Sequence, residues 1–263
     1  MTTRGCVYLA SGRVYNDAAR WSIETLRETG YADGICVFTD DPDGYPGDVE
    51  TRPLGKSVTH PGDSILDERH IVYDENLYTD SDVVWCRDPS SVFELLDSYD
   101  LLVQTGGASS GGDGPRPDAF PGVSATAFAY TRTRDVRELF EAWDRRRAEY
   151  TTQMNRHAFA DVIYTSGISF APLGTNFMTH IKSHHIVGGE VTAVHYQDLA
   201  RSLVEQYLSI IDSTLKHRYV SIEGGEITFQ SGNRSKNMHT FGAYVAMMRR
   251  DMARVVDKLK QKI

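Results

Sequence analysis

A strand–helix–strand pattern at the start of the chain limits the folds that this sequence can adopt. Residues 5–10 (GCVYLA) and 34–39 (GICVFT) are short apolar runs, which are typical of buried strands. Between them, apolar residues recur among charged ones up to Gly30, a residue type that commonly follows the end of a helix. Two strands joined by a helix over about 40 residues predict a βαβ unit, and therefore a mostly parallel central sheet flanked by helices.

Later segments continue this α/β pattern as far as residue 197. Apolar runs at 101–104, 123–132, 168–174, 181–187 and 190–196 predict strands, and 90–100, 135–150 and 155–167 predict helices. Residues 106–122 are rich in Gly, Pro and Ser and predict a long loop. We therefore expect one α/β domain over 1–197. Residues 198–263 should form a mainly helical extension packed on it, with a hairpin across Gly224–Gly225.

Composition excludes several classes of protein. The chain of 263 residues is 40% apolar and 24% charged, as in ordinary globular domains, and its net charge of −8 argues against nucleic-acid binding. Three cysteines with no metal-type spacing are expected to be buried thiols in a reducing compartment. With no signal-peptide or membrane-spanning run, the sequence predicts a cytoplasmic location. The basic closing helix after about residue 240 leaves open contact with a membrane surface, a partner or its own core, and self-association is also open.

A pair of acidic residues is the main candidate for chemistry. Asp80 and Asp82 follow the run Asn76–Thr79, the end of an expected strand. Residues i and i+2 of an extended chain point to the same side, so the two carboxylates would repel each other unless a divalent metal, a basic partner or solvent compensated them.

The position of this pair favours the metal. Chance alone explains two D-x-D triplets in the chain, and the other one, Asp41-Pro42-Asp43, has the composition of a turn. Asp80 and Asp82, however, stand at the carboxyl end of a strand, where α/β sheets bind ligands. Carboxylate oxygens suit Mg²⁺ or Mn²⁺, which usually share their coordination with substrate phosphates.

Three other kinds of site fit the sequence poorly. The LGKS segment at 54–57 would be a P-loop only with glycine at position 50, where Glu50 stands. A phosphatase of the D-x-D-x-T type would need threonine at position 84, which is Val84. The ASGRVYN segment after the first strand lacks the G-x-G-x-x-G pattern of dinucleotide-binding domains.

The segment YDENLYTDSDVVWCRDPSSVFELLDSYDLLV resembles the metal-binding segment of GT-A nucleotide-sugar glycosyltransferases. Its DVVWCRDP portion is similar to the nucleotide-diphospho-sugar transferase group, and the layout of the whole chain over residues 4–197 resembles glycosyltransferase family 8. Further likenesses are VYLASGRVYNDAARWSIETLR, TAFAYTRTRDVRELFEAW, ISFAPLGTNFMTH and EVTAVHY. The resemblance implies a GT-A fold and transfer of a sugar from a nucleotide diphosphate.

The resemblance also implies a set of site residues. Mn²⁺ or Mg²⁺ would bind Asp80, Asp82 and His195. A neutral imidazole beside two carboxylates is a reasonable ligand set for Mn²⁺. The remaining expected contacts are to the nucleotide, from Ala10, Ser11, Tyr15, Thr39, Asp40, Arg69 and Ser81, and to the sugar or acceptor, from Gln104, Ser124 and Asn176.

The sequence departs from the family pattern at two places. Ser124-Ala125-Thr126 stands where the family often has Asn-x-Gly, and Asn155-Arg156 stands where it has Asp-Gln. We assign Asn155 and Arg156 to the catalytic group together with the acid pair. Arg156 could bind a carboxylate or phosphate of the substrate, or lie at the helix surface.

The expected function is that of a metal-dependent hexosyltransferase. It would move a sugar from a UDP-linked donor to the hydroxyl of an unidentified glycan, lipid or protein, with retention of configuration. If transfer inverts, Asp113 or Asp118 is a candidate base. The altered positions also leave open a sugar-nucleotide-binding module without turnover. A third alternative is a metal-dependent phosphatase or nucleotidyl transferase.

Overall fold

A computed structural model of the chain divides it into two compact units. Unit 1 comprises residues 1–178 and 192–195, and unit 2 comprises residues 179–191 and 196–263. This division differs from the boundary expected at residue 197. The structure describes residues 2–54, 66–105, 114–117, 119–150, 155–174, 176–181, 185–188, 190–196, 199–211, 217–223 and 226–231.

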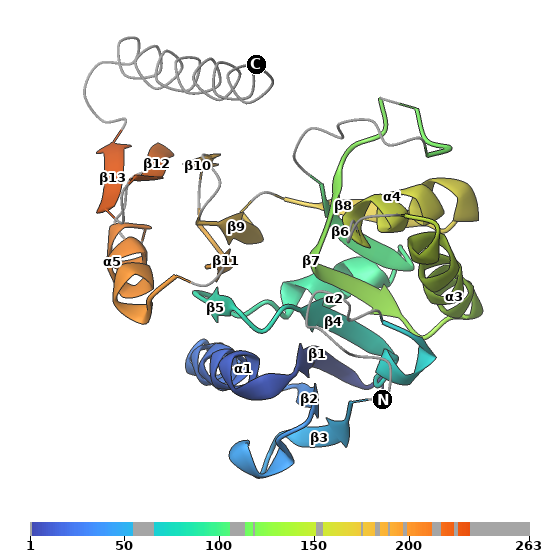
Figure 1. Cartoon of the computed structure of the whole chain (residues 1–263), viewed down its shortest axis with the longest axis horizontal. Coiled ribbons are helices and arrows are strands. Elements are labelled where there is room, and N and C mark those ends of the chain that lie inside the picture. The colour runs from blue at the N-terminus through green and yellow to red at the C-terminus, as the bar shows by residue number, and fades with distance from the viewer. Residues whose placement is uncertain are drawn as a thin grey trace, which may run out of the picture. The chain divides into compact units, whose positions relative to one another are not determined.

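Unit 1 is built on a seven-stranded sheet with the order β3-β2-β1-β4-β7-β6-β8 (Figure 1). The pairs β1–β2, β1–β4, β2–β3 and β6–β8 are parallel, whereas β7 runs antiparallel to both β4 and β6. The expected mostly parallel α/β sheet is confirmed. Its strands are β1 (Arg4–Ala10), β2 (Gly34–Thr39), β3 (Glu50–Pro53), β4 (Glu75–Thr79), β6 (Leu101–Thr105), β7 (Val123–Thr131) and β8 (Phe170–Leu173).

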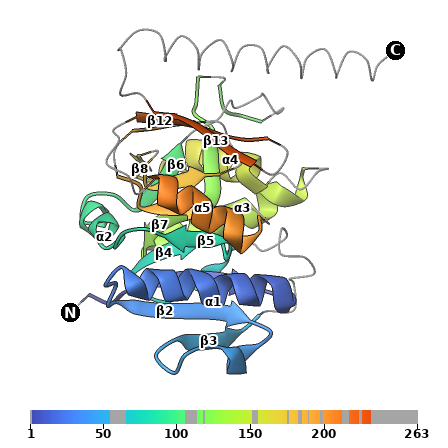
Figure 2. The same ribbon diagram turned by 90° about the vertical axis from the view of Figure 1, so that its left-hand side faces the viewer.

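Helices cover both faces of this sheet, because buried residues alternate between the faces along each strand. On β1, Cys6 and Tyr8 pack with residues of α1 (Gly12–Glu28) and α2 (Ser91–Leu96). Val7 packs instead with residues of α3 (Arg134–Ala148) and α4 (Asn155–Ser166), which lie side by side. Figures 1 and 2 show α1 and the α3–α4 pair on their respective faces. Short 3₁₀ turns, η1 (Pro42–Gly44) and η3 (Glu68–His70), precede β3 and β4.

Two further strands of unit 1, β5 (Val83–Trp85) and β11 (Ala193–His195), belong to a separate and smaller sheet. β5 pairs antiparallel with β11, a short strand from much later in the chain. Trp85 is fixed from the other side, since its indole N–H donates to the Tyr8 hydroxyl at 3.0 Å and its backbone N–H donates to Thr25. The sequence predicted the later strand but not β5, which has only three residues.

Unit 2 contains a three-stranded sheet and one described helix. β12 (His217–Glu223) pairs antiparallel with β10 (His185–Gly188) and with β13 (Glu226–Ser231), which confirms the expected hairpin. α5 (Arg201–Ile211) lies beside β13, and β9 (Met178–His180) begins at the last residue of unit 1. The expected closing helix after about residue 240 lies outside the described residues.

The three cysteines, all expected to be buried, differ in exposure. Cys6 and Cys36 are buried as expected, but Cys86 is exposed, because it is the first residue after β5 and no longer lies between two packed layers. Within the part of the chain that the structure describes, no helix has the length and apolar character needed to span a membrane.

Candidate active site

The acid pair directly follows β4, and it lies in a sharp bend that joins β4 to β5, whereas the sequence suggested extended chain at this point. β4 ends at Thr79 and β5 begins at Val83, so Asp80 and Asp82 are both outside regular structure. Two hydrogen bonds fix the bend: the Ser81 hydroxyl donates to the Leu9 carbonyl at 2.6 Å, and the Asp80 amide donates to the Thr126 carbonyl at 2.8 Å. The bend therefore stands at the carboxyl ends of β1 and β4, the ligand-binding edge of a parallel sheet.

His195 completes a cluster of three side chains that could bind a metal. It pairs with Val83 in the β5–β11 ladder, and its Nε2 lies 3.0 Å from Asp82 Oδ1 and 3.9 Å from Asp80 Oδ2. One ligand atom from each of the three residues lies within 4.8 Å of the others. The fold thus brings together the three metal ligands that the family resemblance implies.

The donor set fits a hard divalent cation. Oxygen or nitrogen ligands at about 2.1 Å in octahedral geometry place neighbouring donor atoms about 3.0 Å apart. The separation of His195 from Asp82 has this value, and the separation from Asp80 is about 1 Å longer. Two carboxylates and one imidazole would leave further coordination positions for water or phosphate oxygens.

The electrostatics of Asp80 reflect its surroundings. Burial, with the neighbouring charge of Asp82, raises the pKa of Asp80 to about 6, although His195 and a hydrogen bond from Tyr78 act in the opposite direction. The Tyr78 hydroxyl donates to Asp80 Oδ1 at 3.0 Å. Sequence reasoning missed Tyr78, even though it precedes Asp80 by two residues in the chain. A cation beside Asp80 would favour the ionised carboxylate.

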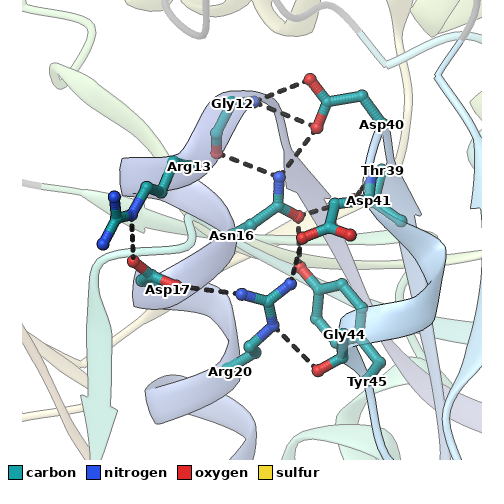
Figure 3. Close-up of polar contacts among 10 residues, drawn as sticks. All are labelled: Gly12, Arg13, Asn16, Asp17, Arg20, Thr39, Asp40, Asp41, Gly44 and Tyr45. Carbon is teal, nitrogen blue, oxygen red and sulfur yellow. Dashed lines mark hydrogen bonds and ion pairs between the residues drawn. The ribbon is translucent and has the colours of Figure 1, made fainter.

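A second polar cluster joins the first turn of α1 to the end of β2 (Figure 3). Asp40 accepts hydrogen bonds from the Gly12 amide at 2.9 Å and from Asn16 Nδ2 at 2.8 Å. Its carboxylate thereby satisfies an N–H group at the helix start, where a negative charge is stabilised by the helix dipole. Desolvation opposes ionisation, but these hydrogen bonds outweigh it and lower the pKa of Asp40.

Asn16 is the centre of this cluster, and sequence reasoning missed it. Its Oδ1 accepts from the Thr39 hydroxyl at 2.6 Å and from the Tyr45 hydroxyl at 2.7 Å, and the side chain is almost fully buried. Thr39 also accepts from the Asp41 amide. The Thr39 hydroxyl is thus buried and already bonded to protein groups, whereas the neighbouring Asp40 is exposed. Only Asp40 of these two predicted nucleotide contacts presents its side chain to solvent.

Of the other predicted nucleotide contacts, most line the β1–α1 turn. Ala10 is buried at the end of β1, Ser11 is the residue before α1, and Tyr15 is partly buried against the core. Gly12 has a φ of +72°, which favours glycine at this turn. Arg69 lies elsewhere, in the η3 turn beside α3, where its guanidinium pairs with Asp67.

The first turn of α4 lies toward the carboxyl edge of the sheet. β8 begins beside Leu101, at the amino edge of the sheet, and α4 ends just before β8. Asn155 and Arg156 are at the other end of α4, and therefore toward the carboxyl edge. Arg156 is exposed, and the side chain of Asn155 lies outside the description, as do Asp113 and Asp118. The position of the α4 start is compatible with the catalytic role expected of these two residues.

A buried ion-pair network holds α4 to the end of the glycine-rich segment. Asp161 of α4 pairs with Arg116 at 2.9 Å and with Arg146 of α3 at 2.9 Å, and it accepts from the Tyr150 hydroxyl. Arg116 also contacts His157 Nδ1 at 2.8 Å, and burial together with this guanidinium lowers the pKa of His157. No sequence signal predicted this network, because its members come from three separate segments.

The three predicted substrate contacts lie on β6, on β7 and between β8 and β9. Gln104 is buried and donates from Nε2 to the Met178 carbonyl. Its register partner on β7 is Ser124, next to a shift in the β6–β7 pairing, and the Ser124 hydroxyl accepts from the Thr126 amide at 3.3 Å. The carbonyl of Asn176 accepts from the Thr192 amide at 2.8 Å. Gln104 and Asn176 thus both make contacts near β11.

Comparisons with known proteins agree with this description. Residues 75–199, somewhat less than half of the chain, match the model of the nucleotide-diphospho-sugar transferase family. Among solved structures, the chain is similar to the apo structure of WbbM, a bifunctional glycosyltransferase, with a TM-score of 0.51 and 12% identity. The alignment covers 74% of this chain and 46% of WbbM, so the chain spans less than half the length of that protein. No curated protein matches the sequence.

The fold is therefore that of a GT-A-type glycosyltransferase, as the sequence resemblance implied. The segment that matches the nucleotide-diphospho-sugar transferase model contains the acid pair and His195. Family 8 in particular remains a resemblance of sequence.

Proposed function

We propose that the protein is a metal-dependent glycosyltransferase that moves a hexose from a UDP-linked donor to a hydroxyl group of a glycan-type acceptor. The observation that carries this proposal is the convergence of Asp80, Asp82 and His195 at the carboxyl edge of the sheet, inside the segment that matches the nucleotide-diphospho-sugar transferase family. The UDP donor, the hexose and retention of configuration come from the family resemblance.

Each part of the site has a stated role in this proposal. Asp80, Asp82 and His195 hold Mn²⁺ or Mg²⁺, which supplies positive charge to the departing diphosphate. Tyr78 orients the Asp80 carboxylate, and Ser81 holds the bend between the two acids through its bond to Leu9. The exposed Asp40 lies at the end of β2, close to the β1–α1 turn, where it can accept hydrogen bonds from ribose hydroxyls.

The catalytic roles of Asn155 and Arg156 are part of the same proposal. Both residues lie in the first turn of α4, at the end of the helix that lies toward the carboxyl edge of the sheet. This position supports the assignment. An exposed guanidinium there suits a carboxylate or phosphate of the substrate, because arginine offers paired donors that match both groups. Replacing Arg156 with lysine would keep the charge but lose that paired geometry.

A thermal-shift series with nucleotide diphosphates and Mn²⁺ tests the proposal. A ligand that binds only the folded protein at a hundredfold excess over Kd stabilises it by about 2.7 kcal/mol, or roughly 5–10 °C in Tm for a domain of this size. We expect UDP with Mn²⁺ to give such a shift, and UDP with EDTA to give a much smaller one. Hydrolysis of UDP-sugars should likewise require the metal.

Two variants make this test specific. Asp82→Ala removes one ligand and should abolish the metal-dependent part of the shift. Asp43→Ala is the matched control, because Asp43 is exposed and belongs to the other D-x-D triplet of the chain. Equal shifts in both variants would contradict the metal site. Donor binding without hydrolysis or transfer would favour a binding module, and release of inorganic phosphate or pyrophosphate would favour phosphatase or nucleotidyl-transfer chemistry.

A further inference from the structure

Gln104 is a buried polar residue whose surroundings do not suit the substrate contact that the sequence suggested. It is 6% exposed and lies on the same face of β6 as the core residue Leu102. Its Nε2 donates to the Met178 carbonyl, while its Oε1 has no hydrogen-bond partner among the described residues. An unpaired buried acceptor lowers the free energy of unfolding. An apolar side chain of the same size would fill this part of the core without that loss.

The hydrogen bond from Gln104 acts on the segment that faces β11. Met178 and Ala193 belong to one buried cluster, and two residues before Met178 the Asn176 carbonyl accepts from the Thr192 amide. The Thr192 carbonyl in turn accepts from the Cys86 amide at 2.8 Å, directly after β5. A continuous series of contacts therefore leads from Gln104 through residues 176–178 to the start of β11.

β11 carries His195, and it is fixed on its other side by β5. The β5 side is tied to the main sheet by the bond between Trp85 and the Tyr8 hydroxyl. Gln104 provides the corresponding connection from β6, through its hydrogen bond to Met178. Residues 176–178 in turn contact β11 through Thr192 and through the buried cluster that contains Met178 and Ala193. The distance between His195 and Asp82 depends on the placement of this short strand.

We infer that Gln104 is a positioning residue that holds β11, and with it His195, in register with Asp80 and Asp82, and that it is not a substrate contact. This inference rests on the proposed function in so far as His195 ligates a metal. The geometric part, that Gln104 fixes β11, holds or fails without any metal.

Amide hydrogen exchange of the metal-free protein tests the geometric part. The Gln104→Met variant keeps the volume of the side chain and removes both polar atoms. We expect the Thr192 and Cys86 amides to exchange about tenfold faster than in the wild type, the change that loss of one hydrogen bond would produce. Core amides of β1, such as that of Tyr8, should keep their rates.

The Gln104→Glu variant gives a second measurement if Gln104→Met folds poorly. An ionised carboxylate has no hydrogen to donate to Met178, whereas a protonated carboxyl does. Relative to the wild type at the same pH, exchange at Thr192 should therefore be fast at pH 8 and return toward the wild-type rate at pH 5. Uniformly faster exchange across the whole domain, or no change at Thr192 and Cys86, would overturn the inference.

Metal titration tests the connection with the site. Gln104→Met should weaken Mn²⁺ binding about tenfold in the absence of nucleotide, while Thr105→Val, a substitution next to it on the same strand, should not. A raised KM for the donor with unchanged Mn²⁺ affinity and unchanged exchange would instead make Gln104 a substrate contact and overturn the inference. If the wild type bound no Mn²⁺, the proposed function would fail, and the exchange measurements would still decide the role of Gln104.

Discussion

The hydroxyl of Tyr78 donates a hydrogen bond to Asp80, two residues further along the chain, at 3.0 Å. Tyr78 is buried at the end of β4, so this bond connects a candidate metal ligand to the core of the sheet. The bond favours the ionised form of Asp80, in opposition to burial and to the charge of Asp82.

Tyr78→Phe should therefore raise the pKa of Asp80 further and weaken metal binding most at low pH. We expect a larger loss of Mn²⁺ affinity at pH 6 than at pH 8, together with a loss of about 1 kcal/mol in the free energy of unfolding. Calorimetric titration at the two pH values measures the first effect. Tyr45→Phe is the control, because it removes a hydrogen bond to Asn16 and not to the acid pair. The same loss at both pH values would contradict this role.

Metal binding should release a proton at Asp80 in the acidic range. Because burial raises its pKa to about 6, Asp80 is partly protonated below that pH and the metal has to displace the proton. We expect Mn²⁺ affinity to fall by up to about tenfold for each pH unit below 6 and to level off above it. Titrations in buffers of different ionisation enthalpy measure the released proton.

The raised pKa of Asp80 also determines how the stability of the metal-free protein changes with pH. A carboxyl group whose pKa is higher in the folded state than in the unfolded chain binds protons better when folded, so this contribution to stability is lost as the pH rises from about 4 to about 6. Asp80→Asn should remove both this dependence and the proton release. A wild-type affinity for Mn²⁺ that stayed constant between pH 5 and pH 8 would contradict the assignment of this proton to Asp80.

Removing the centre of the buried ion-pair network should destabilise the domain strongly. In Asp161→Ala, the guanidinium of Arg116 would remain buried without its carboxylate, and Arg146 and Tyr150 would lose a partner. We expect a loss of about 3–5 kcal/mol in the free energy of unfolding, measured with urea. Asp144→Ala, at an exposed position on α3, should change it by no more than about 0.5 kcal/mol. Similar values for the two variants would show that the network is not a source of stability.

Much of the α/β core could be predicted from the sequence, because it depends on local patterns. Apolar runs and Gly30 predicted β1, α1 and β2, and the long amphipathic pattern predicted α3. β5 could not be predicted in this way, since three residues carry too little periodicity. The direction of β7, antiparallel to its neighbours, also depends on contacts that lie outside the strand itself.

The candidate site could be predicted in part. The acid pair was visible as a motif and His195 through the family resemblance, but the chain bends at Ser81 and does not have the extended geometry that the spacing of the two acids suggested. Tyr78 could have been found from its spacing of two residues to Asp80. Asn16 could not, because its partners Thr39 and Tyr45 are known only once α1 packs on β2.

The three candidate metal ligands are contributed by two segments that lie far apart in the chain, with His195 coming 113 residues after Asp82. At typical elongation rates, a ribosome needs about ten seconds to add that length of chain. The two acids leave the ribosome first, and during that interval the site can offer a cation its two carboxylates but not its imidazole. Full coordination is thus one of the last properties that this domain acquires during its synthesis.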